Sequence, residues 1–124
     1  MKETAYWTWF IIAGVVIFVF AGIHVATVHL SAVTGFFNPA GPNSVAWENV
    51  AYRSRNLFFV ISYILILGAA LYHGFYGLRT IVFELGLKQP ARRSLTAILW
   101  VVGLVLFIFG TYAAISSRNP AMTL

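Results

Sequence analysis

The side chains best placed to carry chemistry in this sequence lie between His73 and Glu84. His73 lies within a long apolar segment, and it is followed by Gly77, Arg79 and Glu84 at spacings of four, six and eleven residues. An ionisable side chain inside a membrane is costly, so it needs either a partner or a function. A neutral imidazole at such a depth can ligate a metal or hydrogen-bond to a neighbouring helix. His73 is therefore the first candidate site residue.

The helical neighbours of His73 are all small. Ala69, Ala70, Gly74 and Gly77 occupy the positions four before, three before, one after and four after it. A porphyrin is a flat plate that must lie against the helix beside its axial ligand, and bulky neighbours would push it away. Small residues leave room for that plate, but they equally allow two helices to pack closely. The pattern thus predicts either a haem ligand or a hydrogen-bonded packing histidine.

Arg79 lies six residues beyond His73, which is ~9 Å further along a helix axis. At that distance its guanidinium is within reach of a haem propionate or of the lipid headgroups. An arginine near the end of an apolar helix also extends to the membrane surface without any ligand. Arg79 is accordingly a candidate cofactor-binding residue with a simpler structural alternative.

The composition indicates a membrane environment for this segment. Of the 124 residues, 60% are hydrophobic and only 9% are charged, and the mean hydropathy is +0.86. A soluble domain of this size has too little interior to bury so much apolar surface. Three apolar runs, at about 9–33, 57–84 and 95–116, each exceed the roughly 20 residues that cross a ~30 Å hydrocarbon layer. The sequence predicts an all-α fold of three transmembrane helices in a single integral membrane domain covering residues 1–124.

The connections carry signals for helix ends. Residues 1–5 form a polar lead, and residues 35–56 form the longest polar connection, with a short surface helix expected within 44–56. Gly86 is well placed to terminate the second span, and Pro90 prevents its continuation. Ser94 is a candidate N-cap for the third span.

Charge and cysteine content narrow the function. The net charge is +5, but the basic residues lie in loops and at helix ends, where they orient the protein rather than bind nucleic acid. Five lysines and arginines fall on the side of the N-terminus and the second connection, and three fall on the opposite side. The positive-inside rule therefore predicts that the N-terminus lies inside. With no cysteine, the chain cannot ligate an iron–sulfur centre, so any such centre must belong to a partner.

The pattern of His73, Gly77, Arg79 and Glu84 resembles the second helix of the membrane-anchor subunits of succinate dehydrogenase and fumarate reductase, respiratory complex II. In that family a histidine followed by Gly-Leu-Arg and then an acidic residue, usually aspartate, marks the ligand of a b haem. Glu84 is a mild departure from this pattern, whereas the chain length and the three spans match it. The resemblance implies a haem-b-binding anchor in a prokaryotic cytoplasmic membrane, with His73 as an axial ligand to the iron.

The resemblance also implies partners and a role. Such an anchor tethers a flavoprotein subunit and an iron–sulfur subunit to the membrane lipid, pairs with a second membrane-anchor subunit, and helps to pass electrons to or from a membrane quinone. The chain is then a non-catalytic subunit of a succinate:quinone oxidoreductase. It supplies one histidine per expected iron, while low-spin b haems usually take two. It therefore forms half of a haem-binding helical bundle that another subunit completes.

His24 and His29 are candidates for a second haem. They are five residues apart, so they point about 140° away from one another and cannot ligate the same iron. If the first helix enters near Trp9, His29 lies ~15 Å deeper than His73 and His24 only ~7 Å deeper. The larger separation suits two stacked haems, and the step from His29 to Leu30 resembles the first helix of diheme anchors. We therefore expect metal ligation by His73 and His29, with His24 as the alternative and two b haems per complex.

Two other functions fit parts of this sequence. A haem-free structural anchor of a respiratory complex explains the stripes of small residues but leaves the histidines without a role. A cytochrome b subunit of another respiratory enzyme, such as a hydrogenase or a nitrate reductase, explains the histidines. Such subunits, however, usually have more spans and more histidines in one chain.

Overall fold

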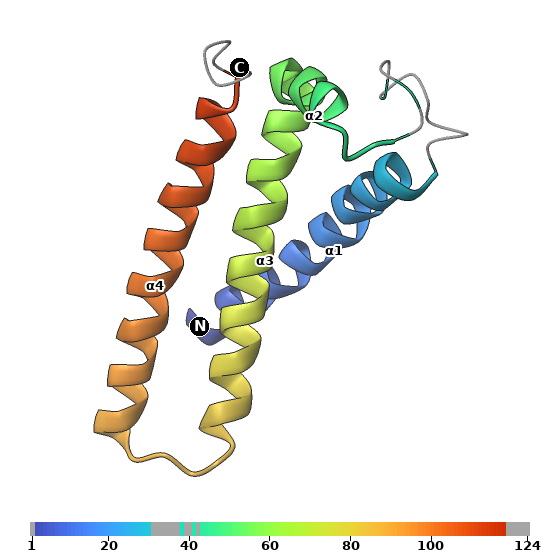
Figure 1. Ribbon diagram of the computed structural model, residues 1–124. Helices are drawn as coiled ribbons and strands as arrows, with labels where there is room; N and C mark the ends of the chain where they lie inside the picture. The colour runs from blue at the N-terminus through green and yellow to red at the C-terminus, as the bar shows by residue number, and fades with distance from the viewer. Residues whose placement is uncertain (1, 31–37, 39–40, 42, 119–124) are drawn as a thin grey trace.

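Four α-helices build the computed structural model, which describes residues 2–30, 38, 41 and 43–118 (Figure 1). They are α1 (Lys2–His29), α2 (Trp47–Arg55), α3 (Leu57–Phe83) and α4 (Gln89–Ser116). The long helices α1, α3 and α4 are apolar and long enough to cross a membrane, because 27 or 28 residues extend over ~40 Å. The predicted all-α fold with three spans is confirmed, and α2 is the short helix expected within 44–56.

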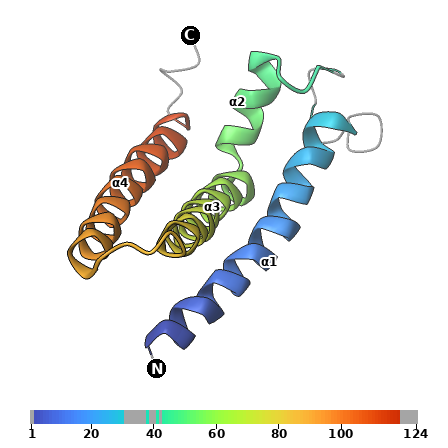
Figure 2. The same ribbon diagram turned by 90° about the horizontal axis from the view of Figure 1, so that it is seen from below.

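The long helices lie in a row with α3 in the middle, as Figure 1 and Figure 2 show from two directions. α3 packs against α1 on one side and against α4 on the other, and it also contacts α2. α4 runs antiparallel beside α3, whereas α1 crosses α3 at an angle and diverges from it toward its own C-terminal end (Figure 1). Both broad faces of the row are open in the single chain, which leaves many large apolar side chains of the long helices exposed.

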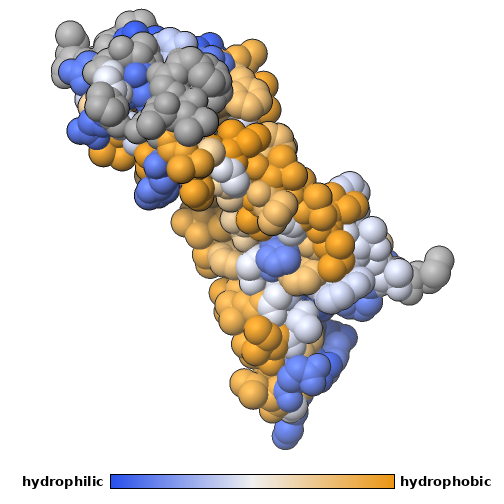
Figure 3. All heavy atoms as spheres, turned by 90° about the vertical axis from the view of Figure 1, so that its right-hand side faces the viewer, coloured by the Kyte–Doolittle hydropathy of each residue, from blue (hydrophilic) through white to orange (hydrophobic). Residues whose placement is uncertain are grey.

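The surface of the row has the polarity that a membrane requires. On the face drawn in Figure 3, apolar residues cover most of the middle of the molecule, around one hydrophilic patch, and the other hydrophilic residues gather toward its two ends. Exposed apolar side chains are stable against lipid tails, because lipid tails are as apolar as leucine. The row therefore presents a hydrocarbon-facing band between two polar ends.

α3 and α4 pack closely because glycines on each helix receive an aromatic ring from the other. A Cβ atom at Gly68 of α3 would lie 3.1 Å from the Phe107 ring of α4. A Cβ atom at Gly103 of α4 would lie 3.3 Å from the Phe75 ring of α3. Small residues on this pair of helices thus serve close helix packing.

The start of α1 differs from expectation more than the ends of α3 do. α1 begins at Lys2, so the predicted polar lead is helical, and it ends at His29. The expected end near residue 33 falls outside the described residues. α3 begins at Leu57, where the Asn56 side chain accepts a hydrogen bond from the Phe58 N–H at 2.9 Å. It ends at Phe83, close to the predicted position.

α4 begins at Gln89, six residues before the predicted start. Lys88 occupies the N-cap position, and Pro90 lies in the first turn, where its missing N–H removes no helical hydrogen bond and its fixed φ suits the helix. The prediction that Ser94 caps this helix is therefore wrong, because Ser94 lies inside α4. Pro90 separates the second span from the third as expected, but it starts the third helix instead of standing in the loop before it.

A buried polar network ties the region before α3 to the end of α1. We call it the Arg53 network, and it consists of Asn38, Ser44 and Arg53. Arg53 is 4% exposed, and its guanidinium donates to the side-chain oxygen of Asn38 and, at 2.6 Å, to the carbonyl oxygen of Ser44. The Asn38 amide and the Ser44 hydroxyl donate in turn to the carbonyl oxygens of Thr27 (3.3 Å) and Val28 (2.8 Å). The guanidinium thus lies near the C-terminal end of α1, where a positive charge is favourable.

Candidate functional site

The imidazole of His73 lies between α3 and α1. Its ring stacks on the Phe10 ring with a centroid separation of 4.1 Å and an interplanar angle of 4°. Its Nδ1 atom lies 3.0 Å from the carbonyl oxygen of Phe10. Gly14 leaves the space that the ring edge fills, since a Cβ atom there would lie 3.2 Å from Cε1 of His73. Phe10 and Gly14 of α1 therefore hold the ring at one height and in one plane.

The contact with Phe10 also selects the tautomer of His73. A backbone carbonyl only accepts hydrogen bonds, so Nδ1 donates its hydrogen to it and Nε2 retains its lone pair. Histidine ligands of metals are arranged in the same way, because the second nitrogen donates to a carbonyl or carboxylate that orients the ring and raises the basicity of the ligating nitrogen. The residues around His73 thus fit an axial ligand of an iron porphyrin.

The small residues beside His73 divide into two groups. Gly77 faces α1, because a Cβ atom there would lie in ordinary van der Waals contact with the Phe10 ring, at 3.5 Å. Gly74 faces open space, with no other described side chain within 4 Å of a Cβ atom built there, and Ala70 is exposed as well. The face of α3 that carries Ala70 and Gly74 is where a flat group has room beside His73.

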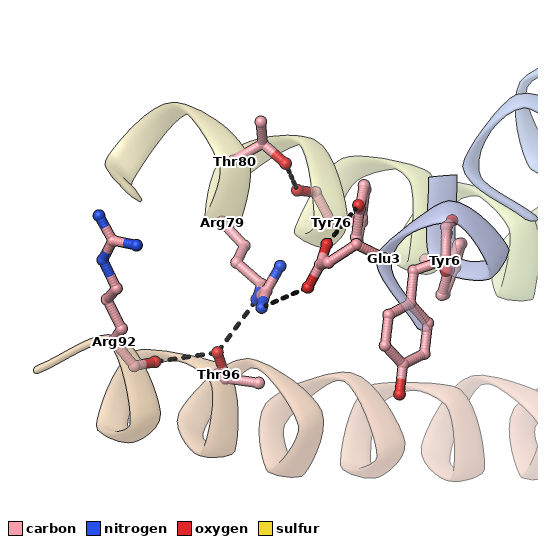
Figure 4. Close-up of polar contacts among 8 residues, drawn as sticks. Glu3, Tyr6, Tyr76, Arg79, Thr80, Arg92 and Thr96 are labelled. Carbon is pink, nitrogen blue, oxygen red and sulfur yellow. Dashed lines mark hydrogen bonds and ion pairs between the residues drawn. The ribbon is translucent and has the colours of Figure 1, made fainter. Parts of the chain in front are cut away.

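Near the end of α3, Arg79 contacts both of the other long helices, through Glu3 on α1 and Thr96 on α4 (Figure 4). Its Nε–H donates to Oγ1 of Thr96 on α4 at 3.1 Å, and its Nη2 lies 3.4 Å from the Glu3 carboxylate on α1. The hydroxyl of Tyr76 donates to the other carboxylate oxygen of Glu3 at 3.1 Å. We call Glu3, Tyr76, Arg79 and Thr96 the Arg79 cluster. It connects the first turn of α1 to α3 and α4.

Most members of the Arg79 cluster carry no signal that singles them out in the sequence. Glu3 is one of only three acidic residues in the chain, and the charge count assigns it to the same membrane surface as Arg79, which is the one clue that pairs them. Tyr76 and Thr96 become recognisable only once the register of the helices is known. Glu84, the acid of the predicted motif, follows α3 directly. It lines a surface hollow that the four residues of the Arg79 cluster also line.

His24 and His29 lie apart from His73. The His24 ring meets the Tyr63 ring of α3 edge-on, at 5.8 Å between centroids and 82° between planes. Tyr63 precedes His73 by ten residues, or ~15 Å along α3. His29 is the last residue of α1 and is exposed, a further ~7 Å along that helix from His24. Within the described ranges, no three histidine or acidic side chains gather into a group that could hold a metal ion.

The distance between the levels of His24 and His73 differs from the ~7 Å expected from the sequence. That value assumes a first helix that starts near residue 9, whereas α1 begins at Lys2 and its first turns pair with the last turns of α3. Phe10, rather than a residue further along α1, is therefore level with His73. In the structure His24 therefore lies ~15 Å from the level of His73 along α3, which is the separation that the sequence predicts for His29.

A sequence model of the family described as "Succinate dehydrogenase/Fumarate reductase transmembrane subunit" matches residues 2–112 of the chain. Comparisons with curated proteins and with solved structures found no match. The matched range contains the His73 site, the Arg79 cluster and both of the other histidines.

Proposed function

Because the chain belongs to the family of succinate dehydrogenase/fumarate reductase transmembrane subunits, we propose that it is a haem-b-binding membrane anchor of a succinate:quinone oxidoreductase. It is an integral membrane protein and one subunit of a larger enzyme. In this proposal it tethers the flavoprotein and iron–sulfur subunits, pairs with a second anchor, and helps to pass electrons to or from a membrane quinone. The proposed orientation places the N-terminus on the cytoplasmic side of a prokaryotic membrane, with the larger group of lysines and arginines.

The observation that supports haem binding most directly is the hydrogen bond from His73 Nδ1 to the Phe10 carbonyl oxygen, at 3.0 Å. This bond leaves Nε2 as the donor atom for iron, and stacking on the Phe10 ring sets the plane of the imidazole. The ligand is thereby preorganised, which lowers the entropic cost of forming the bond to iron. A b haem bound there supplies one-electron transfer. Ala70 and Gly74 provide the open surface against which its plane would lie.

The second axial ligand at this level comes, in our proposal, from the second anchor subunit. His24 and His29 lie at other levels, so they do not share an iron with His73. α1 and α4 flank α3 on its two sides and leave the face of Ala70 and Gly74 uncovered. A histidine-bearing helix of the partner on that face would complete the site.

We propose a second haem on the His24 side of the bundle, with His24 or His29 as its ligand from this chain. The ~15 Å between the levels of Tyr63 and His73 along α3 suits two porphyrins stacked one above the other. This spacing supports His24. His29, at the end of α1, is the alternative.

Arg79 is proposed to bind a haem propionate. Its partner in the structure, the Glu3 carboxylate, is the same kind of group, so a carboxylate is already shown to fit against the guanidinium. The Glu3 side chain is 66% exposed and lies 3.4 Å from Arg79, and such an exposed pair contributes little stability. A propionate can therefore replace Glu3 at little cost.

The proposal is tested by replacing His73 with alanine in the complex that carries this chain. We expect the reduced-minus-oxidised b-type absorbance to fall and the pyridine haemochrome content to drop by one haem per complex, while the flavoprotein subunit stays bound. His24→Ala and His29→Ala are the matched variants, and the one that removes the other haem identifies the second ligand. A His73→Ala complex with its full haem content would overturn the proposal.

A haem-free structural anchor is the second candidate, and one observation favours it. His73 is already hydrogen-bonded to Phe10 and packed against Gly14, as a packing histidine would be. This candidate predicts that the purified complex contains no porphyrin and that no histidine variant changes its spectrum. Family membership decides against the third alternative, a cytochrome b of another respiratory enzyme.

A further inference from the structure

Two adjoining hollows lie along α3 and α4. One is an apolar groove of about 250 Å³, lined by Leu71, Phe75, Leu99, Trp100, Leu104 and Phe107. The other is a hollow of about 1000 Å³ at the end of the helices, and its charged lining residues are Glu3, Arg79, Glu84, Arg92 and Arg93. Tyr76, Arg79 and Thr96 line both, so the two are continuous. We call the pair the α3–α4 cleft.

In the polar part of the cleft, arginine side chains lie at the N-terminal end of α4, where the helix dipole is already positive. α4 has no acidic residue in its first turn, where a carboxylate would complement the exposed N–H groups, and Arg92 and Arg93 follow instead. Among the described residues, the carboxylate–cation contact at this end is the pair of Glu3 and Arg79 at 3.4 Å. Arg79 and Arg92 both lie over the Phe83 ring, at 4.4 and 5.0 Å from its centroid. Such neighbouring cations repel one another, and an anion beside them would remove the repulsion.

We propose that the α3–α4 cleft binds an anionic phospholipid, with an acyl chain in the apolar groove and the phosphate headgroup at Arg92 and Arg93. Basic pockets between transmembrane helices at a membrane surface favour anionic headgroups. Arg92 is held in place for this role, because its Nε–H donates to the Leu87 carbonyl at 3.0 Å and its Nη2 lies 3.5 Å from the Phe83 carbonyl. The apolar lining of the groove matches a hydrocarbon chain, and its continuity with the basic hollow matches an amphiphile.

The cleft lies on the other side of α3 from the open face beside His73. Gly74, on that open face, and Tyr76, which lines the cleft, are two residues apart and so project ~200° apart around the helix. Arg79 also lines the cleft, but the lipid headgroup is assigned to Arg92 and Arg93 and not to Arg79, so the lipid proposal does not rest on haem binding. Leu104→Trp in the groove and Arg92→Gln should leave any b-type spectrum unchanged, so that failure of one proposal is distinguishable from failure of the other.

Native mass spectrometry tests the proposal on the full-length chain, purified in a mild detergent with the subunits that remain bound. After delipidation the protein is titrated with dioleoylphosphatidylglycerol and dioleoylphosphatidylcholine, which share their acyl chains and differ in headgroup charge. We expect the anionic lipid to bind about fivefold more tightly or better, and Arg92→Gln to reduce its affinity about fivefold without changing that of the zwitterionic lipid. Leu104→Trp, which fills the groove, should weaken both.

Two matched variants control for general effects. Arg118→Gln removes a charge beyond the far end of α4, and Leu106→Trp places the same large ring ~200° around α4 from Leu104. Neither should change lipid binding. Equal affinity for the two lipids, or an equal loss in Arg118→Gln, would overturn the proposal. Displacement of phosphatidylglycerol by a similar concentration of inorganic phosphate would also overturn it in favour of an anion site, and displacement by a quinone alone would do so in favour of a neutral ligand.

Discussion

Two arginines at opposite ends of α3 show two uses of a guanidinium in a membrane protein. Arg53, just before α3, is 4% exposed and donates to oxygens of Asn38 and Ser44 that belong to the fold itself. Arg79, one turn before α3 ends, has a 21% exposed side chain, and its acidic partner Glu3 is 66% exposed. The partners of Arg53 cannot leave, whereas the partner of Arg79 can be exchanged. Arg53 therefore serves the fold, whereas Arg79 is the arginine to which we assign a binding role.

The two ends should also differ in their contribution to stability. A hydrogen bond from a charged donor contributes about 1.5–3 kcal/mol, and leaving its buried acceptor unsatisfied adds a further cost. An exposed ion pair contributes only about 0.2–1 kcal/mol. The Arg53 network should therefore hold the fold together far more strongly than the Arg79 cluster.

The largest effect is expected for Arg53→Ala. The substitution leaves the side-chain oxygen of Asn38 and the carbonyl of Ser44 without their donor, so we expect a loss of about 3 kcal/mol in the free energy of unfolding. Thermal unfolding in a neutral detergent, followed by circular dichroism, measures it. Arg55→Ala, an exposed arginine on the same helix, is the matched control and should cost less than about 0.5 kcal/mol. Equal losses of stability in the two variants would mean that the hydrogen bonds of Arg53 do not stabilise the region before α3.

Effects of intermediate size on stability are expected for alanine substitutions at two glycines of α1, between the two arginines. α1 packs closely on α3 at Gly14 but not at Gly22. A Cβ atom at Gly14 would lie 3.2 Å from the His73 ring, which the Phe10 carbonyl and ring prevent from moving aside. We expect Gly14→Ala to destabilise by about 1 kcal/mol. Gly22→Ala meets no side chain within 4 Å and should stabilise by up to about 1 kcal/mol through helix propensity. The same unfolding measurement compares them, and effects of equal sign would contradict close packing at Gly14.

How much of this molecule is predictable from sequence depends on whether a feature is local. The three spans and the place of His73 follow from apolar runs, because each helix must cover the hydrocarbon layer by itself. The sequence places the start of α4 too late, because Pro90 and Ser94 both fit helix starts and the choice between them depends on the chain before them. The level of His24 depends on the register between α1 and α3, which no local pattern specifies.

The two arginines show the same limit. In the charge count, Arg53 is one surface charge among several, yet the structure buries it. The pattern of apolar runs does not predict that Arg53 is buried, because the residues that enclose it lie in the polar connection and at the end of α1. Arg79 is recognisable from its motif, but its partner Glu3 lies 76 residues away. Contacts between distant segments thus decide which arginine is structural.

The smallest effect on stability is expected for Glu3→Gln. This substitution also tests the contrast between Arg53 and Arg79 most directly. The amide oxygen of glutamine can still accept the Tyr76 hydrogen bond, so the substitution removes mainly the charge opposite Arg79. We expect a loss of about 0.5 kcal/mol at low ionic strength. The loss should vanish in ~1 M salt, where the Debye length falls to ~3 Å. The effect of Arg53→Ala should persist in the same salt, because its hydrogen bonds are buried. If Glu3→Gln destabilises as much as Arg53→Ala and salt changes neither, Arg79 is locked into the fold as firmly as Arg53, and an exchangeable partner for it is ruled out.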